Sequence, residues 1–220
     1  MKNSEPQPEP SRSAEACPVD RRILRPVRAR NDWLRKAPYE GAVRRIAVVD
    51  TETTGLAVER HQIIELCMAV VLVNDAGRIA AVEVVRSGLI DPGHPLTAEI
   101  ADLTGLTDQD LAGRSIDEEQ VAEMLASCDG VVAYNAGFDR PFVEKMIDRH
   151  VAVPWGCAMA DVPWRKAGFE PGPQGYVLMQ AGYYMPRAHR AKDDVLALIQ
   201  LLDHVCDDGE TVMTKTLAAM

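Results

Sequence analysis

The chain lacks several features that would narrow its class at once. Its five cysteines are widely spaced and odd in number, and no two form a CxxC pair. Neither a zinc site nor a framework of disulfides is therefore indicated. The start has no apolar signal core, no apolar run is long enough to span a bilayer, and no internal repeat is visible. We expect a soluble protein of the reducing cytoplasm with no membrane partner.

Positive charge is scarce outside one segment. The net charge of the 220 residues is −9, but residues 21–45 carry +7 and residues 46–220 carry −14. An acidic body repels nucleic acid, so a polyanionic substrate would need metal ions and local basic patches. Composition divides the chain into a disordered tail rich in Pro, Glu and Ser, a basic N-terminal arm or helix, one folded domain, and a C-terminal tail, at residues 1–20, 21–44, 45–206 and 207–220.

Two acids stand where the first strongly apolar stretch should end. The sequence IAVVDTETTGL, residues 46–56, predicts a short buried strand followed by a turn, with Asp50 and Glu52 two positions apart. On an extended chain such residues point to the same side. Like charges this close either raise a pKa or hold a divalent metal that prefers oxygen ligands. The alternative is an exposed strand end with incidental acids.

Two further acids lie on apolar faces of predicted helices. Asp139 shares a face with Val143 and Ile147, although an acid near a helix N-terminus can also simply favour the helix dipole. Asp194 shares a face with Leu198 and Leu202 in a helix over residues 190–206. Together with Asp50 and Glu52, these acids predict a metal site of four carboxylates.

The remaining patterns predict an α/β fold. A turn at residues 74–77 joins two apolar runs into an antiparallel hairpin of strands, and a further strand follows Gly130. Helices are predicted near residues 96–103, 117–127 and 177–182, and a strand near residues 157–161. Residues 151–188 are otherwise rich in Pro and Gly, with little periodicity.

Three blocks, VVDTETTGL, YNAGFDRPFV and HRAKDDVLAL, resemble in order the three motifs of the DEDDh group of 3′-5′ exonucleases. That group includes the epsilon subunit of bacterial DNA polymerase III and ribonuclease T. The likeness covers about residues 45–205 and includes the intervening segment PLTAEIADLTGLTDQDLAG. It implies a ribonuclease H-like exonuclease fold, with a five-stranded mixed sheet and helices on both faces.

The resemblance also implies a function and a set of site residues. It implies removal of 3′-terminal nucleotides from single-stranded or frayed DNA, with two divalent cations, Mg²⁺ or Mn²⁺, held by four carboxylates and with His189 as general base. The catalytic residues implied in this way are Asp50, Glu52, Asp139, His189 and Asp194. Alternatives are an exonuclease for RNA or oligoribonucleotides, or a non-catalytic polymerase-binding module of the same fold.

Substrate contacts and partners are expected along the same lines. Thr53 and Leu56 would lie against the terminal base, as the resemblance implies. Phe138 offers a stacking face or is a core aromatic, and Asn135 orients a phosphate or sugar or caps the following helix. Tyr134 departs from the histidine common in the family at that position. We expect a nucleic acid 3′ end as substrate, a possible polymerase or repair partner, and a monomer or homodimer.

Overall fold

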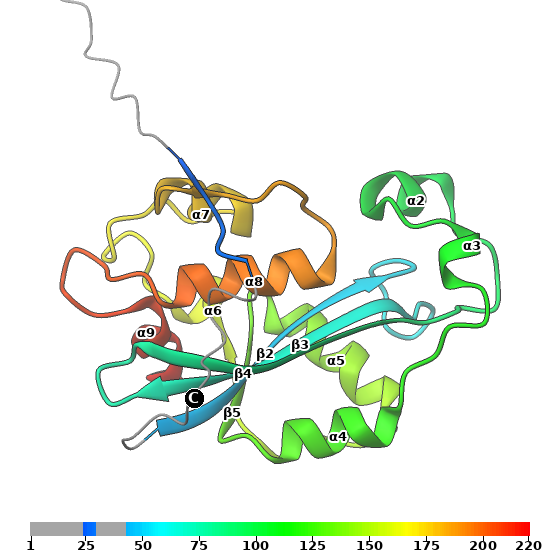
Figure 1. The fold of residues 1–220 in the computed structure, drawn as a ribbon, viewed down its shortest axis with the longest axis horizontal. Coiled ribbons are helices and arrows are strands. Elements are labelled where there is room, and N and C mark those ends of the chain that lie inside the picture. The colour runs from blue at the N-terminus through cyan, green and yellow to red at the C-terminus, as the bar shows by residue number, and fades with distance from the viewer. Residues whose placement is uncertain (1–23, 30–42) are drawn as a thin grey trace, which may run out of the picture.

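A mixed five-stranded sheet forms the centre of the computed structural model, which describes residues 24–29 and 43–220 (Figure 1). The strand order is β4-β3-β2-β5-β6. The pairs β2–β3 and β3–β4 are antiparallel, whereas β2–β5 and β5–β6 are parallel. The prediction of a five-stranded mixed sheet with an antiparallel hairpin is therefore confirmed. The strands are β2 (Val43–Thr53), β3 (Ile63–Asn74), β4 (Ile79–Leu89), β5 (Gly130–Ala133) and β6 (Trp155–Cys157).

Helices cover both faces of the sheet, as predicted. One core cluster packs α6, α7, α8 and α9 against the sheet, and a second packs α4 and α5 against the other face (Figure 1). Short helices α2 and α3 lie on an excursion between β4 and α4. The helices are α2 (Ala98–Thr104), α3 (Asp108–Leu111), α4 (Glu118–Ala126), α5 (Ala136–Met146), α6 (Ala158–Asp161), α7 (Gln174–Gln180), α8 (Ala191–Leu202) and α9 (Val212–Leu217).

The alternation of side chains along β2 decides what lies on each face. Ile46 and Val48 belong to the core beneath α8, whereas Ala47 and Val49 belong to the core beneath α4 and α5. Because the period of a strand is two residues, the even-numbered residues that follow Val48 also face α8. The pairing of β2 with β5 ends at Val48, so β2 extends beyond its parallel neighbour.

The prediction of a C-terminal tail over residues 207–220 is wrong. Helix α9 lies within that range, and its residues Val212 and Met213 are fully buried. Thr211 caps the helix by accepting from Thr214 N, and its hydroxyl donates to the carbonyl of Gly77 at the β3–β4 turn. The N-cap and the two buried apolar residues stabilise this helix against the body of the protein. The sequence does not predict it because the apolar run is too short to show a helical period.

The basic segment 21–44 differs from the predicted arm or helix where it is described. Strand β1 (Arg25–Pro26) pairs in parallel with β7 (Tyr183–Tyr184), and Val27 packs against the core beneath α8. Residues 21–23 and 30–42 of this segment, and the predicted tail 1–20, lie outside the described residues. In the described part of the chain, none of the helices combines the length and apolarity needed to cross a membrane.

Candidate active site

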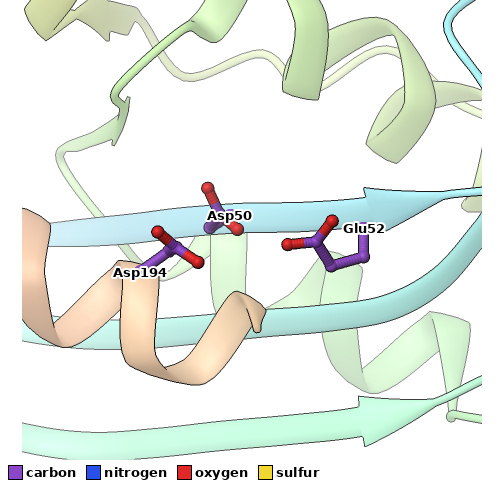
Figure 2. A group of neighbouring side chains, drawn as sticks. All are labelled: Asp50, Glu52 and Asp194. Carbon is purple, nitrogen blue, oxygen red and sulfur yellow. The ribbon is translucent and has the colours of Figure 1, made fainter. Parts of the chain in front are cut away.

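Three carboxylates converge where β2 meets the start of α8. Asp50 and Glu52 project from β2 toward the α8 face, and Asp194 projects from the first turn of α8 (Figure 2). One oxygen from each of the three groups lies within 4.8 Å of the others. Carboxylate oxygens in such an arrangement are the ligands that Mg²⁺ and Mn²⁺ prefer. The donor set therefore fits a hard divalent cation.

Helix α8 presents Asp194 because its apolar stripe faces the sheet. Val195, Leu198 and Leu202 are buried in the shared core, which fixes the rotation of the helix about its axis. Asp194 Oδ2 accepts a hydrogen bond from the Arg190 backbone N at 3.0 Å, so the carboxylate also caps the first turn. Its neighbour Asp193 is outside the group of converging carboxylates.

Asp139 approaches the same place from the opposite face. It lies on α5, is buried, and its Oδ1 accepts from Thr51 N at 3.0 Å and Thr51 Oγ1 at 2.8 Å. Thr51 is the odd-numbered residue between the two acids of β2, which explains why Asp139 bonds to it. Asp139 is not one of the three carboxylates within 4.8 Å, yet its charge is close enough to raise the pKa of Asp50.

The four acids hold protons more tightly than usual. Burial, and then repulsion by neighbouring carboxylates, raises the pKa of Glu52 to about 8 and that of Asp50 well above its ordinary value. Burial also raises the pKa of Asp139 to about 7, against the hydrogen bonds from Thr51. The pKa of Asp194 rises to about 6, again through burial. A cation among these groups would relieve both the repulsion and part of the desolvation.

His189 lies near Asp194, one of the converging carboxylates. It is exposed, occupies the turn just before α8, and has a φ of 62°, in the left-handed region. The charge of a protonated His189 is close enough to lower the pKa of Asp194, opposing the dominant effect of burial. His189 is therefore close enough to influence Asp194 but is not buried among the carboxylates.

The four predicted substrate-contact residues lie around the same strand end and helix start. Leu56 is 84% exposed, and Thr53 is buried with its Oγ1 donating to the Gly55 carbonyl at 2.7 Å. Asn135 occupies the N-cap position of α5, but its side chain makes no capping hydrogen bond. Phe138 is half-buried, with its ring 5.0 Å from that of Phe142, so it is partly a core aromatic.

Tyr134, the departure from the common motif, has a structural contact. It is buried, and its hydroxyl donates to the backbone carbonyl of Gly172. This bond ties the end of β5 to the segment that leads into α7. Gln174, at the start of α7, in turn donates to the backbone carbonyl of Asp194 at 2.8 Å. The Pro- and Gly-rich segment is thus attached to the site at both places.

Sequence reasoning missed one acid and its partner at this site. Glu65 is 2% exposed and lies opposite Glu52 in the pairing of β2 with β3. It forms an ion pair with Arg190, the residue between His189 and α8. The signal was a single acid inside the otherwise apolar run IIELCMAVVLV. An acid in a buried strand requires a partner, but 125 residues separate the two.

Curated relatives match part of the chain. The DNA polymerase III PolC-type protein of Streptococcus mutans is 34% identical over 107 residues, covering 47% of this chain and 7% of that protein. The PolC-type protein of Streptococcus thermophilus is 30% identical over 140 residues, covering 62% of this chain and 8% of that protein. The chain therefore corresponds to a small part of the length of these relatives.

Solved structures share the fold at low sequence identity. The complex of Escherichia coli ExoI with single-stranded DNA has a TM-score of 0.58 at 13% identity, covering 74% of this chain and 40% of that one. Exonuclease X in complex with 5′-overhanging duplex DNA has a TM-score of 0.53 at 21% identity, covering 77% and 99%. These similarities support the expected ribonuclease H-like fold.

A family model, RNase_T, described as Exonuclease, matches residues 47–202. That range contains all three acidic blocks and His189. The family implies divalent metal ions, which agrees with the chemistry of the carboxylate cluster. The chain belongs to this exonuclease family and, as its three motifs indicate, to the DEDDh 3′-5′ exonuclease group.

Proposed function

We propose that this chain is a metal-dependent 3′-5′ exonuclease that removes terminal nucleotides from single-stranded or frayed DNA. The observation that carries the proposal is the convergence of three carboxylates from β2 and α8, with a fourth acid behind them on α5. Hydrolysis of a phosphodiester needs an activated water, stabilisation of charge at phosphorus, and a leaving 3′ oxygen. The converging carboxylates and the residues around them can meet each of these requirements.

Asp50, Glu52 and Asp194 would hold two divalent cations, Mg²⁺ or Mn²⁺, with Asp139 supporting the second. When bound, such cations lower the pKa of water and stabilise the attacking and leaving oxygens. The raised pKa values support this assignment, since ordinary structural carboxylates are balanced by cationic side chains or donors. Thr51, through its two hydrogen bonds, would keep one oxygen of Asp139 engaged and so fix the direction of the other.

His189 would act as general base. The residue is exposed and lies near Asp194, so a water beside the terminal phosphate could transfer a proton to an imidazole nitrogen. An imidazole titrates near neutral pH, which suits repeated uptake and release of that proton. General bases contribute about 10²- to 10⁴-fold to such rates.

The terminal nucleotide would enter between the β2–β3 loop and the start of α5. The largely exposed Leu56 would wedge against the terminal base, with the backbone at Thr53 beside it. Phe138, which is only half-buried, would stack on the base, and the side chain of Asn135, which makes no capping hydrogen bond, would orient the sugar or phosphate. Such a site accepts an unpaired end only.

Relatives and structural neighbours favour DNA as the substrate. The two relatives named above are DNA polymerase III PolC-type proteins, and the two structural neighbours named above were solved with single-stranded DNA and with overhanging duplex DNA. The same relatives favour a polymerase as partner, with a DNA repair protein as the other choice. Net negative charge on the body makes metal ions necessary for the approach of any nucleic acid.

Degradation of end-labelled oligonucleotides tests the proposal. We expect stepwise shortening of single-stranded DNA from its 3′ end in Mg²⁺ or Mn²⁺, none in EDTA, and slower shortening of RNA of the same sequence. Asp50→Ala should abolish the activity, because its carboxylate belongs to the converging group. Faster cleavage of RNA would change the substrate, whereas cleavage of neither polymer would contradict the exonuclease assignment.

A further inference from the structure

Glu65 is a buried acid to which the proposed chemistry gives no task. It lies on β3 and is 2% exposed, in a strand whose neighbours are apolar. The register of β2 with β3 places it directly opposite Glu52, on the face that carries the carboxylate cluster. A buried carboxylate is unfavourable unless other groups bond to it, so its partners show what it does.

In the described structure, all the groups that donate hydrogen bonds to the Glu65 carboxylate belong to Arg190 and Ala191, at the start of α8. Glu65 Oε2 accepts from Arg190 Nε at 3.0 Å and from the Ala191 backbone N at 3.3 Å. Glu65 Oε1 accepts from Arg190 Nη2 at 3.3 Å. A guanidinium that bonds to both oxygens of a carboxylate fixes direction as well as distance. β3 thereby holds both the side chain of Arg190 and the first amide of α8.

The held residues directly follow His189, whose backbone is strained. A φ of 62° is uncommon for a residue with a Cβ, and such a conformation persists only where the surroundings impose it. Arg190 N also donates to Asp194 Oδ2. The turn at residues 189–191 is therefore held from two sides, by Glu65 from the sheet and by Asp194 from within the helix.

We infer that Glu65 and Arg190 form a positioning pair for the catalytic turn. The pair sets the direction of the His189 ring relative to the acids of β2. Without it, the backbone at His189 relaxes toward an ordinary negative φ and the imidazole moves away from the carboxylates. The expected change in kcat rests on the proposed function. The expected change in the backbone at His189 rests only on the contacts described above.

Glu65→Gln removes the charge while keeping the shape of the side chain. We expect kcat to fall by about 10- to 100-fold, because small displacements of a catalytic group have effects of that size. KM for DNA should change by less than about threefold, since Glu65 is buried and touches no substrate. Unchanged kcat would overturn the inference. If Glu65→Gln does not fold, Arg190→Lys is the second variant. It keeps the positive charge but cannot bond to both carboxylate oxygens as the guanidinium does, and kcat should fall in the same way.

Asp203→Asn is a matched control. Asp203 follows α8 at its other end and accepts from Arg78 Nε, Arg78 Nη2 and the Ile79 backbone N, so it is the same kind of acid–arginine fork with a backbone amide. It lies away from the converging carboxylates. We expect kcat of the folded Asp203→Asn protein to stay at the wild-type value. An equal fall of kcat in both variants would mean that Glu65 only stabilises the fold.

A double-mutant cycle with His189→Ala separates positioning from stability. In the His189→Ala background, Glu65→Gln should lower the rate by less than about threefold, because the group that it misplaces is already absent. Equal losses in both backgrounds would overturn the inference. Hydrogen exchange of the Arg190 and Ala191 amides gives a readout without activity: it should become faster in Glu65→Gln and stay unchanged in Asp203→Asn. Unchanged exchange in Glu65→Gln would refute the positioning pair, whether or not the chain degrades nucleic acid. Failure of the wild type to degrade nucleic acid would refute only the proposed function.

Discussion

The two ends of α8 each place an aspartate against the same sheet, with opposite consequences. Asp194, in the first turn, joins a cluster of acids whose pKa values are raised by burial and mutual repulsion. Asp203, at the C-cap, is 7% exposed and accepts from Arg78 at 2.8 and 2.7 Å and from Ile79 N at 2.9 Å. One acid is left among like charges, and the other is balanced by a guanidinium.

The difference separates an acid that we propose to bind a metal ion from an acid that stabilises the fold. The helix dipole favours an acid at the start of α8 and disfavours one at its end, yet Asp203 is the better compensated of the two, because of Arg78. The carboxylates around Asp194 stay unbalanced in the metal-free chain and store unfavourable free energy that a divalent cation would release. The arrangement of partners, rather than burial alone, therefore indicates where ligands bind.

Asp194→Asn should have the largest effect on activity and an opposite effect on stability. Loss of a metal ligand removes several kcal/mol of transition-state stabilisation, so we expect the exonuclease rate to fall by about 10³-fold or more. The metal-free variant should be more stable than the wild type, because one of the repelling acids is gone. Initial rates in Mn²⁺ and urea unfolding in EDTA measure both. A less stable metal-free variant would contradict the idea of stored repulsion.

The metal-free protein should lose stability as pH rises from about 5 to 8. The pKa values of Glu52, Asp139 and Asp194 are raised to about 8, 7 and 6, so the folded chain keeps protons there that the unfolded chain has already released. For each such proton, the free energy of unfolding falls by about 1.4 kcal/mol for every unit by which the pH rises. The stabilisation is present below the ordinary carboxyl pKa and disappears as pH passes the raised values.

Unfolding by urea in EDTA across this pH range measures the effect. Saturating Mn²⁺ should remove most of the slope, because the carboxylates are then ionised in the folded state as well. Asp194→Asn should reduce the slope in EDTA, whereas Asp203→Asn should leave it in place. A metal-free stability that does not change between pH 5 and 8 would show that the acids are ionised without a cation.

The parts of this comparison that depend on local pattern could be predicted from sequence. The alternation in IAVVDTETTGL placed two acids on one side of a strand end, and the apolar stripe of α8 placed Asp194 on its inward face. Both follow from the fixed periods of strands and helices. The hairpin β3–β4 followed from its turn and from the apolar runs on either side of it.

The remaining parts depend on contacts between distant residues, which no local period reveals. Asp139 approaches from the other face through Thr51, 88 residues away, rather than joining the other three acids within 4.8 Å. The Arg78–Asp203 fork joins residues 125 apart, and the two-residue strands β1 and β7 are too short for a strand pattern. Helix α9 resembles a tail in sequence because its two buried apolar residues, Val212 and Met213, form too short a run.

The smallest expected effect is that of Asp203→Asn on stability. We expect the free energy of unfolding to fall by about 1–3 kcal/mol, because an amide cannot pair with the charge of Arg78 while accepting the same three hydrogen bonds. The upper limit is modest because the Arg78 side chain is 47% exposed and water solvates its charge. Urea unfolding in saturating Mn²⁺ measures the loss. Activity per folded molecule should not change. A fall in activity would mean that the contacts of Asp203 at the end of α8 also affect the carboxylates at its start.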